Sequence, residues 1–326
     1  MMRRIAATAA VVVALAALGA CGGGDGDADP TPSTTGGGAA AGPVTVEHRY
    51  GTTTVEAPPR RIVSLDNQWT DVLVALDAPL VGAALDPSAP DGRWPWQDRI
   101  PAEVEGIAVT DSTIPFEAVA ALDPDLIVIT WFAQGEQDYE RLSQIAPTIP
   151  LLGDEQVDRW QDIASVAGQV LRDEAGARRL VDEADRRVEA LRRELPGLEG
   201  RTYALANYVP GDAIYVVADP DDGASELFAS LGMEIDPELL ALAGGASGRV
   251  ELSLERIGEL DSDLLVLLTN GADPDTIPGF ADLPAVRSGA VALLDLASIS
   301  GLNTPSPLSI PYSLDRLRPA LEAAAT

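Results

Sequence analysis

The sequence predicts an α/β protein in which a long helix joins two α/β lobes. Three observations support this fold class. Residues 173–195 carry a narrow apolar stripe at three- and four-residue steps, the pattern of a long amphipathic helix. Short apolar segments alternate with helical patterns on both sides of it, as sheets covered by helices require. A helix-to-strand unit also recurs on either side of the long helix, at an offset of 138 residues.

The chain of 326 residues is expected to begin with an export signal and a tether. Residues 1–20 join a basic start to an apolar run too short to span a bilayer, which is typical of a signal peptide. Residues 21–43 lack large apolar side chains and predict a flexible tether. Cys21, the only cysteine, ends an L-G-A-C sequence that resembles a lipobox, so we expect it to carry a lipid that holds the exported protein to the outer face of the membrane.

The N-terminal lobe is expected to span residues 44–157. Residues 44–55 alternate around His48 and Gly51 and predict a hairpin. Apolar runs too short for helices then predict buried strands, and helical patterns lie between them. The expected strands are residues 60–65, 80–85, a short one near 107, 126–130 and 149–151. The expected helices are residues 70–76, 116–122 and 139–145.

A helical connector is expected over residues 158–196, and the C-terminal lobe over residues 197–326. The long helix of roughly 23 residues would measure about 35 Å, enough to bridge two lobes, although an ordinary surface helix is the alternative. Four acid–arginine pairs should support it: Glu174–Arg178, Asp182–Arg186, Glu183–Arg187 and Glu189–Arg193. In the C-terminal lobe the expected strands are residues 202–206, 213–217, 264–268 and 291–294, and the expected helices are residues 225–231, 254–260 and 314–323.

An internal repeat relates the two lobes. Residues 116–128 align without a gap with residues 254–266. In each copy a helix ends in Leu-Asp-x-Asp and leads into a buried strand, and the alignment pairs Glu117 with Glu255. Such a unit can recur by chance in α/β proteins, so the match supports two similar lobes chiefly because the long helix lies between the copies.

The composition argues against several classes of protein. The net charge is −29 and lysine is absent, so nucleic acid and anionic lipid headgroups are not expected as partners. Neutral or cationic ligands are favoured, although a local arginine can override the average. His48 is the single histidine and no G-x-S-x-G elbow occurs, so a Ser-His-Asp enzyme is not expected unless His48 serves. Residues 244–248 lack the G-K-[ST] ending of a phosphate-binding loop. We expect no catalytic residues.

Six segments, taken in order, resemble the iron-siderophore/cobalamin substrate-binding proteins of ABC importers. They include IPFEAVAALDPDLIVIT and ELSLERIGELDSDLLVLLT, the two copies of the repeat. The resemblance covers residues 44–323, and its segments are residues 58–85, 114–130, 139–150, 160–188, 251–269 and 280–296.

This resemblance implies a class III periplasmic-binding fold, with two Rossmann-like lobes, one rigid inter-lobe helix and a ligand between the lobes. It also implies a monomer that hands its ligand to an ABC permease and its ATPase subunits. In the family a glutamate of each lobe docks onto basic permease residues, and the matching positions are Glu117 and Glu255. A solvated carboxylate near a helix N-terminus is the alternative for either one.

The candidate ligand-binding residues lie in loops at the expected strand ends. They are Trp69, Arg93, Trp94, Trp96, Asp111 and Trp131 in the first lobe, and Tyr208, Arg249 and Asn303 in the second. Any one tryptophan can instead plug the core, but we expect some of them to face the ligand. In the family the residue six before each docking glutamate lies beside the ligand, which implies Asp111 and Arg249. Cobalamin binders commonly place aromatic rings there, so this departure weakens a cobalamin assignment.

The expected ligand is an Fe(III)-siderophore complex, with a hydroxamate type favoured. Anionic catecholate or citrate complexes need several converging cations, and only Arg93 and Arg249 are candidates. A neutral or cationic hydroxamate would gain from tryptophan faces and an acidic surround. No protein metal site is expected, because a bare ion needs several ligands and His48 is alone, at the surface or in the hairpin. Cobalamin, haem and a tethered scavenger or sensor without transport stay open as alternatives.

Overall fold

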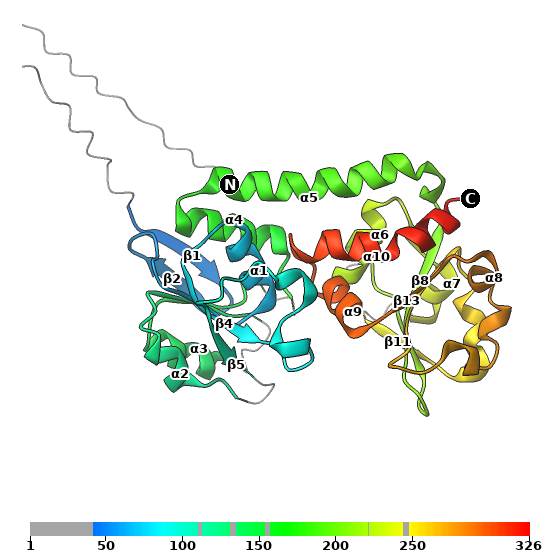
Figure 1. The fold of residues 1–326 in the computed structure, drawn as a ribbon, viewed down its shortest axis with the longest axis horizontal. Coiled ribbons are helices and arrows are strands. Elements are labelled where there is room, and N and C mark those ends of the chain that lie inside the picture. Colours follow the sequence, from blue (N-terminus) through cyan, green and yellow to red (C-terminus); the bar gives the residue numbers. More distant parts are fainter. Residues whose placement is uncertain (1–41, 110–112, 131–134, 154–156, 221, 244–247) are drawn as a thin grey trace, which may run out of the picture. The chain divides into compact units, whose positions relative to one another are not determined.

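A computed structural model describes residues 42–109, 113–130, 135–153, 157–220, 222–243 and 248–326. These residues belong to one compact unit that contains two large β-sheets and a separate two-stranded sheet (Figure 1). The sheets lie before and after a pair of helices, α4 (Trp160–Leu171) and α5 (Glu174–Glu194). The α/β fold with two lobes and a long joining helix is therefore confirmed.

The N-terminal lobe contains a five-stranded sheet in the order β5-β4-β3-β6-β7, with all neighbouring strands parallel. Buried Val, Ile and Leu side chains on its strands explain why they read as continuous apolar runs. An antiparallel hairpin precedes the sheet. The strands are β1 (Val44–His48), β2 (Gly51–Val55), β3 (Ile62–Ser64), β4 (Leu80–Leu85), β5 (Glu105–Ala108), β6 (Leu126–Val128) and β7 (Thr148–Ile149). The helices are α1 (Asn67–Ala75), α2 (Phe116–Ala121) and α3 (Glu136–Ser143).

The C-terminal lobe contains a six-stranded mixed sheet in the order β11-β9-β8-β12-β13, with β10 also paired to β8. The strands β8, β12 and β13 are parallel, whereas β9 is antiparallel to both of its neighbours. The strands are β8 (Thr202–Tyr208), β9 (Ile214–Val217), β10 (Glu234–Ile235), β11 (Arg249–Leu252), β12 (Leu264–Leu268) and β13 (Val291–Leu294). The helices are α6 (Gly223–Ser230), α7 (Pro237–Ala243), α8 (Pro284–Ser288), α9 (Leu296–Asn303) and α10 (Ser309–Ala324).

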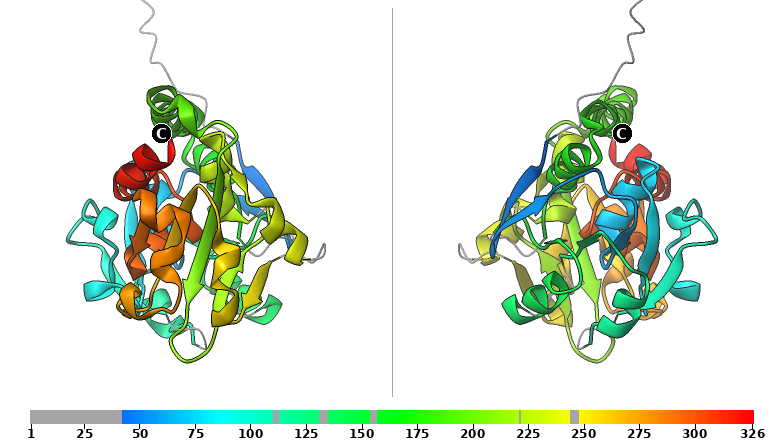
Figure 2. Two further views of the ribbon diagram at one scale, coloured as in Figure 1. Left: turned by 90° about the vertical axis from the view of Figure 1, so that its right-hand side faces the viewer. Right: turned by 90° about the vertical axis from the view of Figure 1, so that its left-hand side faces the viewer.

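The long helix α5 packs on elements of both lobes. Its stripe of buried residues, Ala177, Ala184, Val188 and Leu191, contacts α4 on one side and α6 and α10 on the other. The views along its axis show α10 beside α5 (Figure 2). The helix begins where Asp173 Oδ1 accepts a hydrogen bond from the backbone N–H of Gly176 at 2.8 Å, the usual N-cap arrangement.

The ion pairs on the charged faces of α5 differ from those expected. Among the described ion pairs, Glu183 contacts both Arg187 at 3.1 Å and Arg186 at 2.8 Å. Arg186 and Arg193 donate instead to backbone carbonyls one turn earlier. Of the four expected pairs only Glu183–Arg187 forms, because an exposed arginine can reach several acceptors of similar energy.

The structure adds elements that the sequence pattern did not predict. The strand β11 has four residues, and α7, α8 and α9 are short, so each gives little periodic signal. Residues 254–260, expected as a helix, form a 3-10 helix. His48 lies in the hairpin but is buried, with its Nε2 2.9 Å from Thr53 Oγ1 and its ring edge-on to Tyr139; burial lowers its pKa.

A glycine sets the close approach of α4 to α5. A Cβ at Gly168 would lie 2.6 Å from the Cβ of Ala177 and 3.1 Å from the Cα of Glu174. We expect Gly168→Val to lower the free energy of unfolding by about 1–3 kcal/mol, because neither contact can move without separating the two helices. Urea denaturation measures this. Gly258→Val is the control, since a Cβ there meets nothing within 4 Å; equal losses in the two variants would contradict the close-packing argument.

Candidate functional site

The carboxyl ends of the parallel strands define one edge of each sheet. In the first lobe β3, β4, β5 and β6 end at the same edge, and in the second β8, β12 and β13 do so. Open α/β sheets bind ligands outside such edges, because the loops that follow the strands can converge there. Almost all of the predicted ligand residues follow these strands or lie next to them.

The two lobes contact each other through α1 and the loop after β4 on one side, and through α9 and α10 on the other. The amide of Gln68 donates to the carbonyl of Pro305 at 2.8 Å. The indole of Trp96 lies 5.3 Å from the ring of Tyr312, between centroids. Ala89, Trp94, Ala297 and Leu308 complete this small apolar cluster.

A buried carboxylate, Asp71 on α1, lies at the centre of this contact. Its Oδ2 accepts from the indole N–H of Trp96 at 2.8 Å and from the hydroxyl of Ser306 at 2.5 Å. Its Oδ1 accepts from the amide of Gln97 at 2.8 Å. Burial raises the pKa of Asp71 to about 7, the three hydrogen bonds oppose that rise, and the nearby carboxylate of Asp66 adds to it. Because Ser306 belongs to the second lobe, the carboxylate joins the lobes directly.

Three of the tryptophans predicted to bind ligand are buried in this conformation. Trp69 is 0% exposed and packs in the core as part of α1. Trp94 and Trp96 are 3% and 8% exposed, and their rings stack on each other with centroids 5.7 Å apart. All three indoles are thus covered by protein in this conformation, and their contact with a ligand stays a prediction.

Two further candidates are partly covered. Arg93 folds back on its own loop and donates to the carbonyl of Val104 at 3.3 Å. Tyr208, the last residue of β8, is buried, and its carbonyl accepts from the side chain of Asn270 at 2.8 Å. Neither side chain extends freely from the strand ends.

Arg249 and Asn303 come together beside the contact between the lobes. Arg249 begins β11 and is exposed, and its guanidinium donates to the Asn303 side-chain oxygen at 3.3 Å. Asn303 is the last residue of α9, two residues before Pro305, which contacts the first lobe. Within the described part of the chain Arg249 has no carboxylate partner, so its charge stays available to a ligand.

The two predicted docking glutamates occupy equivalent places. Glu117 is exposed in the first turn of α2, and Glu255 is exposed in the first turn of the 3-10 helix 254–260. The backbone N–H of Glu255 and the hydroxyl of Ser253 hold the pKa of the Glu255 carboxyl below its usual value. Both carboxylates can accept a partner's cations.

Three predicted residues, Asp111, Trp131 and Cys21, lie outside the described residues. In the described ranges, no three His, Cys, Asp or Glu side chains are placed to hold a metal ion together. In the same ranges no helix has the length and hydrophobicity that a bilayer crossing needs.

Comparison with known proteins shows the family to which the chain belongs. The sequence model described as "Periplasmic binding protein" matches residues 62–297. The chain belongs to the periplasmic binding protein family. As a member it is a substrate-binding protein and not an enzyme.

Several periplasmic binding proteins are similar to the chain. The "Probable siderophore-binding lipoprotein YfiY" of Bacillus subtilis is 28% identical over 238 residues, which cover 70% of each chain. The crystal structure of a periplasmic solute binding protein from Mycobacterium smegmatis has a TM-score of 0.74 and 26% identity, and covers 87% of this chain and 99% of that one. The structure of Streptococcus pneumoniae PiaA in complex with ferrichrome has a TM-score of 0.69 at 22% identity, covers 86% and 98%, and supports the fold alone.

The buried polar network of this periplasmic binding protein was not found from the sequence. Its members are Asp71, Trp96, Gln97 and Ser306. The one available signal was a carboxylate inside the segment from Trp69 to Val74, whose other residues apart from Thr70 are apolar; only a buried partner would compensate that carboxylate. The partners of Asp71 come from 25, 26 and 235 residues away, separations that no local pattern reveals.

Proposed function

We propose that this periplasmic binding protein captures a ferric siderophore, of the hydroxamate type, outside the cytoplasm and delivers it to an ABC importer. In this proposal Cys21 carries the lipid that anchors the protein, and the permease with its ATPase subunits is the partner. A relative described as a probable siderophore-binding lipoprotein supports the class of ligand.

The observation that carries the ligand assignment is the sparse positive charge at the strand ends. Among the described candidates, Arg249 alone is exposed without a carboxylate partner, and Asn303 beside it offers an amide. A neutral or cationic ferric hydroxamate presents carbonyl oxygens that one guanidinium and one amide can bind. A polyanionic catecholate or citrate complex would lose its hydration without enough cations to replace it.

The protein's part in transport is binding and presentation, without bond chemistry. Arg249 and Asn303 would hold the chelate from the second lobe. Iron travels as cargo inside its chelator. Glu117 and Glu255, one on each lobe, would then present the loaded protein to basic permease residues.

Calorimetric titration of the purified protein tests this function. The ligands are a ferric trihydroxamate, a ferric catecholate, ferric citrate, haem and cobalamin, each against its buffer. We expect saturable binding of the trihydroxamate with a Kd in the order of 1 μM or lower, and much weaker binding of the others. Tight binding of a polyanion or of cobalamin, with none of the hydroxamate, would overturn the ligand assignment.

Removing the positive charge of Arg249 gives a second expected result. Arg249→Ala should weaken the binding of the ferric trihydroxamate by about tenfold, since a hydrogen bond from a charged donor is worth roughly 1.5–3 kcal/mol where it is shielded from water. Arg287→Ala on α8 removes the same charge elsewhere and should leave the Kd unchanged. Equal affinities in the two variants would show that Arg249 does not contribute to ligand binding.

A further inference from the structure

One short segment of the second lobe, Asn303–Ser306, carries both a candidate ligand residue and contacts with the first lobe. We call it the clasp segment. Its first residue is the asparagine that contacts the free guanidinium at the start of β11. Towards its end, the carbonyl of Pro305 accepts from the Gln68 amide at 2.8 Å, and the hydroxyl of Ser306 donates to Asp71 at 2.5 Å. A ligand contact and two contacts between the lobes therefore depend on one stretch of backbone.

The clasp segment is tied to the helices on both sides of it. The backbone N–H and the hydroxyl of Thr304 both donate to the carbonyl of Ser300 on α9, at 3.0 Å and 2.8 Å. The backbone N–H of Ser306 donates to the hydroxyl of Ser309, the first residue of α10, at 2.9 Å. Between these bonds the ring of Pro305 fixes the backbone φ angle. A displacement at the start of the segment is for these reasons transmitted to its end.

The hydrogen bond between the clasp segment and Asp71 joins two groups that are already held in place. Within the first lobe, the side chains of Trp96 and Gln97 donate to the carboxylate and fix its orientation. Within the second lobe, the hydroxyl of Ser306 accepts from the backbone N–H of Ser309 at 2.9 Å, which leaves its single proton for the carboxylate. Since neither partner has to be ordered when the lobes meet, little entropy is lost in forming the bond.

A glycine brings the end of α9 close to the first lobe beside the clasp segment. A Cβ at Gly301 would lie 3.3 Å from the Cη2 and Cζ3 atoms of Trp96 and 3.1 Å from the hydroxyl of Ser313. The indole cannot move away freely, because its N–H donates to Asp71 at 2.8 Å. The lobes are thus in tight contact where the clasp segment begins.

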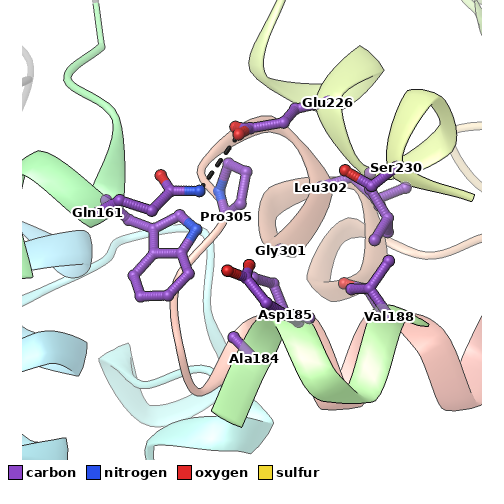
Figure 3. Close-up of a pocket in the computed structure, with 13 residues that line it drawn as sticks. Gln161, Ala184, Asp185, Val188, Glu226, Ser230, Gly301, Leu302 and Pro305 are labelled. Carbon is purple, nitrogen blue, oxygen red and sulfur yellow. Dashed lines mark hydrogen bonds between the residues drawn. The ribbon is translucent and has the colours of Figure 1, made fainter. Parts of the chain in front are cut away.

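The clasp segment also borders on empty space. A cavity of about 500 Å³, its open mouth included, lies between the connector helices and the second lobe. Gly301, Leu302 and Pro305 line it, and the rest of its wall comes from α4, α5, α6 and α10 (Figure 3). A segment next to such a space can shift without forcing close-packed side chains apart. The clasp segment therefore has both a closed position and room to leave it.

We propose that the clasp segment holds the lobes together and sets the rates at which ligand enters and leaves. The effect on ligand rests on the proposed function, whereas the closed clasp is a property of the ligand-free chain. Trp94 and Trp96 at the contact are 3% and 8% exposed, so the clasp is closed in this structure. A ligand that binds Asn303 acts on the same segment and shifts the balance between closed and open lobes. Release of the two hydrogen bonds lets ligand pass, and their return retains it.

Acrylamide quenching of tryptophan fluorescence tests the clasp in the purified, ligand-free chain. Ser306→Ala removes the donor to Asp71 from the second lobe. Gln68→Met removes the donor to Pro305 from the first lobe and keeps a side chain of similar length. Each variant loses one hydrogen bond between the lobes, so we expect the quenching constant to rise about twofold or more as the two indoles at the contact become accessible.

Ser262→Ala is the matched control for the loss of a buried hydroxyl. Ser262 lies in the second lobe, and its hydroxyl has no hydrogen-bond partner among the described residues. Its quenching constant should equal that of the wild type. Wild-type quenching in both Ser306→Ala and Gln68→Met, or an equal rise in Ser262→Ala, would overturn the proposal.

Stopped-flow mixing with a ferric trihydroxamate tests the effect on ligand exchange. We expect Ser306→Ala and Gln68→Met to raise the association and dissociation rate constants together, by about threefold or more, so that the Kd changes less than either rate constant. Simple damage to the binding site would raise the dissociation rate constant alone, and that result or wild-type rates in both variants would overturn the role in exchange. A wild type that binds no trihydroxamate would instead contradict the proposed function, and the quenching result alone would then decide whether the clasp exists.

Discussion

Replacing Glu117 and Glu255 together by alanine is expected to abolish uptake of the ferric siderophore while leaving its binding unchanged. Both carboxylates are exposed in first turns, one on each lobe, and neither forms an ion pair within the described structure. Loss of two charge pairs with the permease should cost about 1.4 kcal/mol or more each, which is roughly a hundredfold in productive docking. Uptake of radioactive iron into cells that carry the variant, beside calorimetry on the purified protein, measures the two effects separately.

A matched pair of glutamates controls for charge. Glu136 is exposed in the first turn of α3, and Glu238 is exposed in the first turn of α7. Their double alanine variant changes the net charge equally and should transport normally. If the Glu117/Glu255 variant also transports normally, docking through these residues is wrong. A scavenger or sensor without transport would then be favoured.

The second large effect concerns pH and the carboxylate that joins the lobes. Burial raises the pKa of Asp71 in the folded state to about 7, against an ordinary pKa of 3.8 for the free side chain. As pH rises, the unfolded chain therefore loses the Asp71 proton at a lower pH than the folded chain does. The free energy of unfolding should for this reason fall as pH rises from about 4 to about 7. The linked contribution is in the order of 4 kcal/mol. Urea denaturation of the wild type at pH 5 and pH 8 should show the loss at the higher pH.

The variant Asp71→Asn should lack this part of the pH dependence. The asparagine keeps one oxygen that can accept hydrogen bonds from Trp96 and Ser306. It loses the second oxygen, which accepts the hydrogen bond from the side-chain amide of Gln97. We expect a constant cost of about 1–3 kcal/mol for the donor left unpaired, with the pH-linked fall absent. Asp77→Asn, just beyond the end of the same helix, is the control. If the free energy of unfolding fell equally from pH 5 to pH 8 in the wild type and in Asp71→Asn, the pH dependence could not be assigned to Asp71.

The sheets and the long helix could be predicted because their signals are local. Strands such as β12 and β13 are short apolar runs, and their expected bounds match the structure. The helix α5 was expected over residues 173–195 and spans Glu174–Glu194, since its stripe and its Asp173 cap both lie within the segment. Patterns of this kind depend on neighbours within a few residues of the chain.

The positions of the tryptophans could not be predicted in this way. The helix α1 begins at Asn67 rather than residue 70, because Asp66 accepts a hydrogen bond from the backbone N–H of Trp69. That earlier start places Trp69 on the core-facing side of a helix instead of in a loop. Trp96 packs on Tyr312, more than 200 residues away, and such contacts leave no local pattern.

An iron-edge anomalous difference map, from crystals grown with a ferric trihydroxamate, tests the central claim most directly. The iron position is independent of any assumption about side chains. We predict a single iron peak between the lobes at the carboxyl ends of the strands, with the chelate against Arg249 and Asn303. An iron peak elsewhere, or crystals that take up no iron at saturating chelate, would contradict the account.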